Sequence, residues 1–194
     1  ADVRREADAA VKARSWDASY YVDADHIGID NVDLFVDASD FFTLDVADFT
    51  GQPAAREETD IFMERFASYI GDIDIPGLDE PVAVNRPQLE NIAASYLKAV
   101  KEAARTYRHI AASKGADSFV TEVSMDETDK PQTPVELLFI LGAIAAEGIP
   151  AQTIAPKFSG RFNKGVDYVG DVNQFATEFE QDVAVLALAT QRFD

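Results

Sequence analysis

The chain has 194 residues, 47% of them hydrophobic, so it is long enough and apolar enough to bury the core of one domain. Its 35 acidic and 17 basic residues give a net charge of −18, which would repel a duplex phosphate backbone, and we expect no nucleic-acid partner. No cysteine is present, which excludes disulfides and thiol nucleophiles. The apolar stretches are too short to span a bilayer, so we expect a cytoplasmic protein without a membrane partner.

The first part of the chain predicts alternating helices and strands. Aromatic and β-branched residues favour a short strand at 19–23 and a second strand at 41–46. Helices are expected at 2–14 and 32–38. Apolar residues at helical spacing predict an amphipathic helix over 56–70.

The rest of the chain repeats this plan after an excursion at 71–87, where prolines and glycines predict a loop. A helix is expected to begin at Thr133 or Pro134 and to end near Gly148. The other expected elements, in chain order, are a helix over 88–112, a strand over 118–124, a strand over 152–155, a loop over 156–170 and a last helix from 171.

Strands that alternate with helices predict a parallel sheet with right-handed crossovers, which is the α/β class. The expected strand–helix units make up about half of an eight-unit barrel. No linker divides the chain. We therefore expect residues 1–194 to form a single, partial domain, either about half of a TIM-like (β/α) barrel or an open α/β sheet.

Polar residues collect where the expected strands end, which is where parallel α/β folds place their ligand sites. His26 suits a divalent metal of the manganese, zinc, cobalt or iron type, because neutral imidazole is the commonest transition-metal ligand; otherwise it is a loop histidine bonded to the backbone. Lys157 and Arg161 could hold a substrate carboxylate, or could pair with surface acids. The acids at these ends are Asp25, Asp45, Glu122 and Asp126.

The large acidic excess has two explanations. The one we favour is a solvated acidic surface, as in adaptation to high salt. The other is that acids line a site, which only a few of them could do. The acids occur singly or in pairs along the chain and do not form an acidic tail.

Four segments of the sequence resemble the tagaturonate epimerase family and occur in the family's order. They are DADHIGIDNVD at 23–33, FTLDVADF at 42–49, TEVSMDETDKPQTPVE at 121–136 and APKFSGRFNKGVDY at 155–168. Family members are longer, and the chain resembles the middle part of the enzyme. Further metal-binding histidines are expected in the family's downstream segment.

The resemblance implies a TIM-like barrel that binds one divalent metal and interconverts D-tagaturonate and D-fructuronate, keto sugar acids that differ at C4. It implies that Asp25 is the general base, Glu122 the general acid and His26 a metal ligand. Asp45, Asp126, Lys157 and Arg161 are then expected to contact this small-molecule substrate.

The chemistry favours retro-aldol cleavage between C3 and C4 followed by re-addition, because the C4 hydrogen is β to the ketone and is not acidic. Transient oxidation of C4 would need a nicotinamide cofactor, and the sequence has no fingerprint for one. Two other functions remain open: another metal-dependent sugar aldolase or isomerase, and a non-catalytic fragment of such a barrel. The sequence does not predict the oligomeric state.

Overall fold

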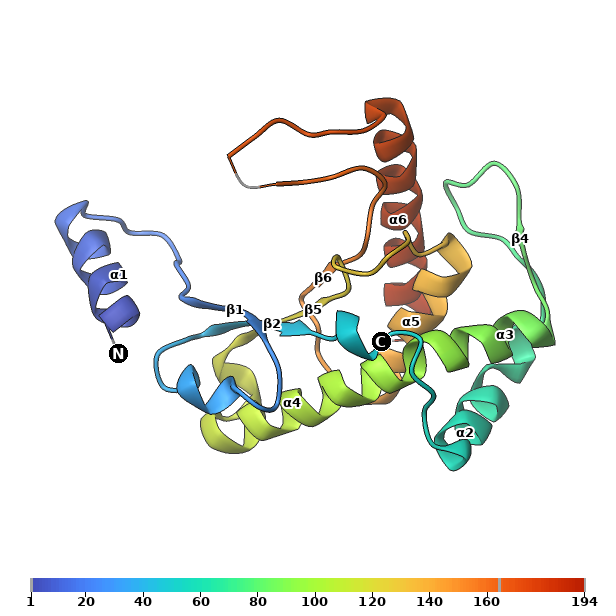
Figure 1. The fold of residues 1–194 in the computed structure, drawn as a ribbon, viewed down its shortest axis with the longest axis horizontal. Helices are drawn as coiled ribbons and strands as arrows, with labels where there is room; N and C mark the ends of the chain where they lie inside the picture. Colours follow the sequence, from blue (N-terminus) through green and yellow to red (C-terminus); the bar gives the residue numbers. More distant parts are fainter. Residues whose placement is uncertain (1, 164, 194) are drawn as a thin grey trace.

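The computed structural model describes residues 2–163 and 165–193 and shows an α/β fold around a mostly parallel sheet (Figure 1). The central sheet has the order β1-β2-β5-β6, and all three strand pairs are parallel. Its strands are β1 (Asp23–Ile27), β2 (Phe41–Asp45), β5 (Val120–Ser124) and β6 (Thr153–Ala155). A separate antiparallel hairpin consists of β3 (Gly71–Ile73) and β4 (Val82–Val84).

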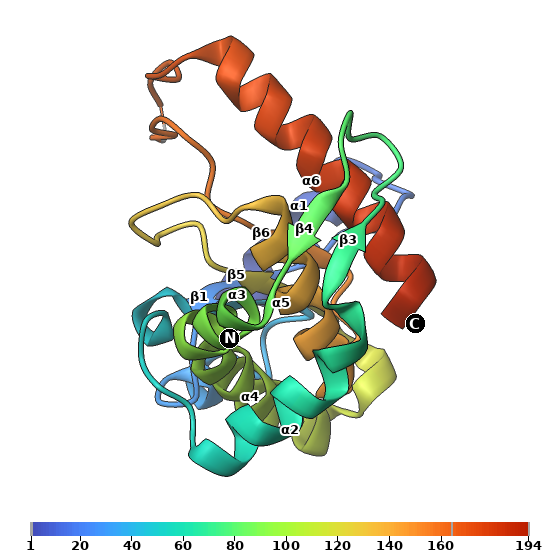
Figure 2. The same cartoon turned by 90° about the vertical axis from the view of Figure 1, so that its right-hand side faces the viewer.

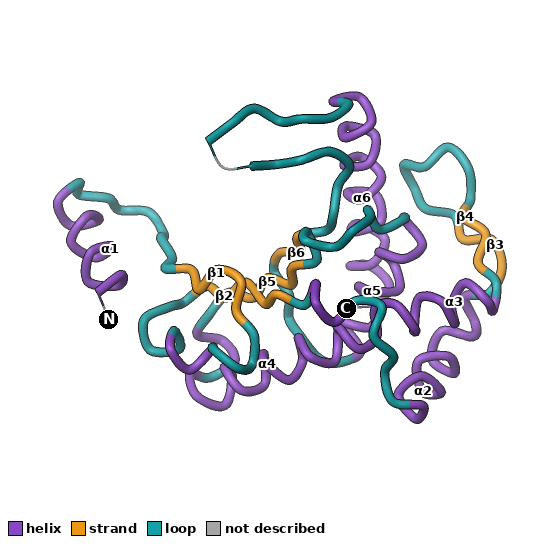
Figure 3. Tube along the Cα trace, in the orientation of Figure 1, coloured by secondary structure: helices purple, strands orange, loops and turns teal. Residues whose placement is uncertain are grey.

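Helix α4 runs along one side of this sheet, whereas α1 lies beyond the β1 end and α6 lies toward the β6 end (Figure 3). The α-helices are α1 (Asp2–Ala13), α2 (Arg56–Phe66), α3 (Arg86–Ile92), α4 (Lys98–Lys114), α5 (Pro134–Ala146) and α6 (Val172–Phe193). Helix α4 packs against β2 and α5, and α5 packs against α6. Figure 2 shows α6 lying across α5, with the β3–β4 hairpin beside it. Among the described residues, no helix is long and apolar enough to cross a membrane.

The two faces of the central sheet differ in chemistry because side chains alternate along each strand. One face is apolar and fully buried against the helices; it includes Ala24, Phe42, Leu44 and Val123. The other face carries Asp23, Thr43 and Glu122, and the Thr43 hydroxyl lies within 3.5 Å of both acids. The sheet therefore has a packed side and a polar side.

Local sequence signals explain the start of the most buried helix. Thr133 caps α5 by accepting a hydrogen bond from the Glu136 amide, and the Glu136 carboxylate bonds back to Thr133, as expected for a helix beginning at Thr133 or Pro134. Leu138 and Phe139 are fully buried, since α5 is covered on several sides.

Three sequence predictions are wrong in position or extent. The helix expected at 32–38 is only a 3-10 helix at Val32–Leu34, followed by turns. The first strand is 23–27 rather than 19–23; Tyr20 and Tyr21 are exposed, and the Tyr20 hydroxyl donates to Asp8 of α1. Exposed and buried side chains already alternate from Tyr21, but pairing with β2 begins only at Asp23. The excursion at 71–87 was predicted to be a loop, yet it contains the β3–β4 hairpin, whose prolines all lie outside the paired residues.

Asp182 is a charged residue on the buried side of α6, with 6% of its surface exposed. Burial, and to a smaller extent the charge of Glu178, raises the pKa of the Asp182 carboxyl to about 6. The folded state therefore binds this proton more tightly than the unfolded chain does.

The sign of this shift predicts a pH dependence of stability. The contribution of protonated Asp182 is fully present below the ordinary carboxyl pKa and is lost as the pH rises through about 6. Between pH 4 and pH 7 the free energy of unfolding of the wild type should fall by on the order of 2 kcal/mol relative to Asp182→Asn. Urea unfolding at several pH values measures this difference. Parallel pH profiles for the two proteins would contradict it.

Candidate functional site

A β-bulge in β1 sets the position of His26. The β1–β2 register shifts between Ala24 and Ile27, and His26 has φ +56°, in the left-handed region that side-chain-bearing residues seldom adopt. Bulges re-aim side chains and occur often beside active sites. Such strain persists only where the surrounding structure enforces it, and it is frequent at functional positions.

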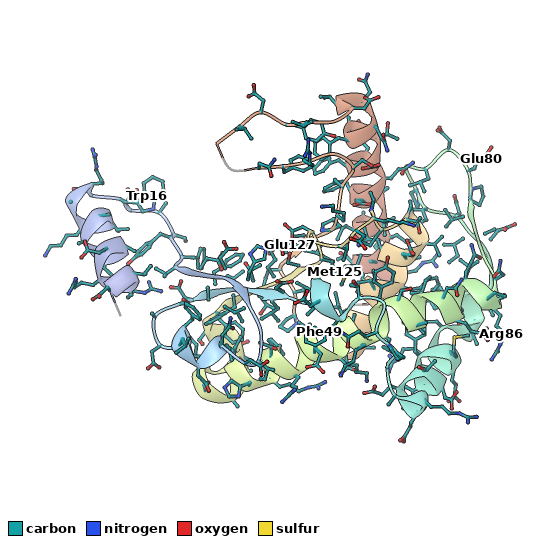
Figure 4. All side chains as sticks on the ribbon, viewed as in Figure 1. Trp16, Phe49, Glu80, Arg86, Met125 and Glu127 are labelled. Carbon is teal, nitrogen blue, oxygen red and sulfur yellow. The ribbon has the colours of Figure 1, made fainter. Side chains whose placement is uncertain are left out.

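The His26 imidazole is oriented by a carboxylate on one nitrogen. Its Nδ1 lies 2.7 Å from Asp25 Oδ1, whereas its Nε2 is buried and has no hydrogen-bond partner among the described residues. The nearest acids to Nε2 are Asp126, at 3.6 Å, and Glu127, at 3.9 Å. Figure 4 labels Glu127, on the side of the sheet away from α4. An imidazole held by a carboxylate with its other nitrogen free is the usual arrangement of a metal-binding histidine.

Acidic neighbours also set the charge of His26. Partial burial lowers its pKa, but the hydrogen bond to Asp25 and the charges of Asp126 and Asp45 outweigh burial and raise the pKa above the ordinary value. The surroundings therefore favour a positive charge at this position, which the imidazolium or a bound cation can supply.

A second acidic group lies further back on the same polar face. Thr43 is 3% exposed, and its hydroxyl is 3.3 Å from both carboxylate oxygens of Asp23 and 3.5 Å from Glu122 Oε1. Burial, followed by the charges of Asp25 and Glu122, raises the pKa of Asp23, and the Thr43 hydroxyl partly offsets this. A hydroxyl has one proton to donate, so Thr43 can serve only one of the two acids at a time.

Two hollows adjoin these residues. His26 lines one of about 240 Å³ together with Asp45 and Asp48. The other, of about 360 Å³, has Asp126 and Lys157 in its wall. Its remaining wall is apolar and is formed by Ile154, Ala155 and Pro156 and by the aromatic rings of Phe158, Phe162, Phe175 and Phe179. His26, in the wall of the first hollow, lies 3.6 Å from Asp126, in the wall of the second.

The two predicted cations lie on the segment after β6. Neither Lys157 nor Arg161 forms an ion pair with any described residue, although both are surrounded by an acid-rich chain. Lys157 is half-buried in the wall of the larger hollow, whereas Arg161 is exposed and forms an isolated backbone bridge with Val169. Of the two, Lys157 is nearer to the acids at the sheet.

Several of the predicted site residues come together in space. Asp25, His26 and Asp126 form one contact group, and Asp45 lines the same hollow as His26. Glu122 belongs instead to the group around Thr43. Within the part of the chain that the structure describes, no cluster of three or more histidine, aspartate or glutamate side chains is arranged to hold a metal ion.

Sequence reasoning missed the roles of Asp23, Thr43 and Glu127 in these contacts. The alternation within β1 could have placed Asp23 on the same face as Asp25, had the strand been assigned correctly. Thr43 required knowledge of the register, because its partners belong to β1 and β5, which are distant in sequence.

Comparison with known proteins gives the family of the chain. The family model for tagaturonate epimerase matches residues 1–190. The chain belongs to the tagaturonate epimerase family. Tagaturonate/fructuronate epimerase from Thermotoga maritima is 26% identical over 195 aligned residues, which cover 95% of this chain and 40% of that protein.

Solved structures of a fructuronate-tagaturonate epimerase from Cohnella laeviribosi have the same fold as this chain. A complex with one glycerol gives a TM-score of 0.76 at 20% identity, covering 94% of this chain and 40% of that one. The native structure gives 0.70 at 21% identity. The chain thus spans about 40% of the length of these relatives.

The backbone strain at His26 can be measured through stability. His26→Gly removes a left-handed penalty of about 1–2 kcal/mol and adds unfolded-chain entropy worth about 0.5–1 kcal/mol, so its free energy of unfolding should match or slightly exceed that of the wild type. His26→Val should lose about 1–3 kcal/mol, because a β-branched residue tolerates this conformation poorly. Denaturant unfolding of the wild type and both variants measures these free energies of unfolding. Equal losses for Gly and Val would mean that the conformation is not strained.

Proposed function

We propose that this chain is part of an epimerase that interconverts D-tagaturonate and D-fructuronate by inverting C4. The observation that carries the proposal is the family match over residues 1–190. The polar face of the sheet supports it, because the match includes both the bulged strand with His26 and the strand with Glu122.

The reaction we propose is a retro-aldol cleavage followed by an aldol addition. A base removes the proton of the C4 hydroxyl, the C3–C4 bond breaks, and its electrons form an enolate on the ketone half while C4 becomes an aldehyde. The aldehyde rotates and presents its other face. The enolate then re-forms the C3–C4 bond, and an acid returns the proton to the C4 oxygen, so that no oxidant or reductant is needed.

Asp25 and Glu122 are the proposed proton-transfer groups, since both belong to the polar face of the sheet. General acid–base catalysis of this kind is commonly carried out by a pair of carboxyl groups. Asp23 lies on the same face, and burial followed by the charges of Asp25 and Glu122 raises its pKa. Thr43 can stabilise Glu122 or Asp23 by donating its single hydroxyl proton.

His26 is the proposed metal ligand of this chain; because the described residues form no group of three that could hold a metal ion, further ligands of a divalent cation would have to come from other parts of the longer protein. Within the described part of the chain the buried Nε2 has no hydrogen-bond partner, and the carboxylates of Asp126 and Glu127 lie 3.6 Å and 3.9 Å from it. A catalytic transition-metal site commonly takes about three protein ligands, and mixed imidazole and carboxylate donors suit manganese, zinc, cobalt or iron. Such a cation, when bound, would supply Lewis-acid stabilisation of negative charge on the substrate.

The barrel is also a proposal. In the described residues, β1 and β6 each pair on one side only, and an open sheet edge normally has to be covered or paired. Because the relatives are about two and a half times as long as this chain, further strands from the remaining polypeptide could close the sheet into a TIM-like barrel. The polar face would then be its interior.

The function is tested by supplying fructuronate and a divalent metal to the full-length protein that contains this chain. We expect tagaturonate to form, and His26→Ala to lower both the metal content and the turnover, the latter by about a hundredfold or more. Metal analysis and product chromatography measure the two quantities. The matched control is His109→Ala, because His109 is a surface histidine whose ring lies 2.6 Å from Asp33.

A wild-type protein that binds metal but never converts fructuronate would overturn the epimerase proposal. Normal metal content and normal turnover in His26→Ala would show instead that His26 is not a ligand.

Lys157 is expected to bind the substrate carboxylate. Lys157→Ala should raise the KM for the uronate by about tenfold, since a charge-assisted hydrogen bond is lost, and should leave the KM for the uncharged C6 amide nearly unchanged. Lys130→Ala, which removes an exposed lysine from the preceding loop, is the control. A similar rise in KM for both compounds would argue against carboxylate recognition.

A further inference from the structure

The buried side chain of Gln132 connects the two loops that carry Asp126 and Lys157. Its Oε1 accepts a hydrogen bond of 2.8 Å from the Lys157 amide, and its Nε2 donates one of 3.0 Å to the Thr128 hydroxyl. Only 7% of Gln132 is exposed, so both ends of its amide bond to protein rather than to water. None of the roles assigned above uses this residue.

The bond at Lys157 lies where the sheet no longer holds the two loops together. The Met125 amide donates to the Ala155 carbonyl at 2.8 Å, which is a hydrogen bond beyond the last paired residues of β5 and β6. After this point the chains separate, one into the Asp126 turn and the other into the segment of Lys157. Gln132 then fixes the Lys157 backbone to the start of α5.

The other end of Gln132 braces the turn that follows Asp126. The Thr128 hydroxyl donates to the Met125 carbonyl at 2.9 Å and so accepts from Gln132. Thr128 is 9% exposed, and its amide also donates to the Met125 carbonyl. One amide side chain therefore bonds both to the turn that follows Asp126 and to the backbone of Lys157, and Asp126 and Lys157 both line the larger hollow.

A π-helical segment supplies a third contact. Ala93–Leu97 joins α3 to α4 as a π-helix, and the Ser95 carbonyl accepts from the Gly51 amide at 2.7 Å. Within this segment Tyr96 interacts with Gln132 and Glu136; burial and the charge of Glu136 raise the pKa of Tyr96 to about 12, so it stays protonated. Single π-helical turns occur frequently at functional sites.

We propose that Gln132 is a positioning residue that holds Lys157 at a set distance from Asp126, and so places the substrate carboxylate relative to the reacting C4. This inference rests on the proposed function. Gln132 acts only through Lys157 and touches no reacting atom. Its contribution is geometric, because small displacements of a substrate-binding group lower the rate steeply.

The test compares Gln132→Met with Gln152→Met in the full-length protein. Methionine keeps the length of the side chain and removes its hydrogen bonds. Gln152 is a matched control, since its Oε1 accepts from the Thr121 amide at 2.7 Å near the beginning of β5, away from the proposed site. We expect the KM for fructuronate to rise about tenfold in Gln132→Met and to stay unchanged in Gln152→Met.

Two further readouts separate positioning from a merely structural role. Hydrogen exchange at the Lys157 amide should become faster in Gln132→Met alone. In the Lys157→Ala background, Gln132→Met should add nothing to the KM, because it acts through that lysine. If Gln132→Met does not fold, Thr128→Val should raise the KM for fructuronate. Thr128→Ser, which keeps the hydroxyl that bonds to Gln132, should have the wild-type KM.

The positioning role would be overturned if the increases in KM caused by Gln132→Met and Lys157→Ala multiply in the double variant. It would also be overturned if the exchange rate of the Lys157 amide is the same in Gln132→Met as in the wild type. Wild-type protein without any epimerisation would instead overturn the proposed function, and the exchange measurement would still decide whether Gln132 holds Lys157.

Discussion

The parallel pairing of β2 with β5 is the interaction on which the rest of the structure depends. It places Thr43 beside Glu122, and β1 adds Asp23 on the other side. Because the alternate residues of the same strands form the core against α4 and α5, a slip of one residue would bury the acids and expose Phe42. The polar face is therefore fixed by the same register that fixes the core.

Two departures from regular structure adjust this rigid frame. The bulge at His26 turns its imidazole toward Asp126 and Glu127, which follow β5, and it requires a left-handed backbone at His26. The π-helical segment directs Tyr96 toward the loop that holds Gln132. A third contact fixes the segment after Lys157 to α6: the Ser159 hydroxyl and amide both donate hydrogen bonds to Glu178. Site geometry thus depends on contacts outside the sheet.

The sequence predicted the parallel α/β class and the polar strand ends because both follow from local periodicity, and Thr133 followed by Pro134 indicated the start of α5. The first strand was misplaced because Tyr20 and Tyr21 have high β-propensity, whereas tertiary contacts keep them outside the sheet. Neither Thr43 nor Gln132 was identified, since their partners are distant in sequence. Pairings of that kind are set by the fold as a whole.

We propose that a keto sugar acid reacts on the polar face of the sheet, from Glu122 to His26 and Lys157. A crystal structure of the full-length protein with fructuronate bound tests it most directly. The account predicts substrate density over this face, with the carboxylate against Lys157 and the C4 hydroxyl near Asp25 or Glu122. Substrate bound elsewhere, for example in the hollow between α5 and α6, with the polar face filled only by water, would contradict it.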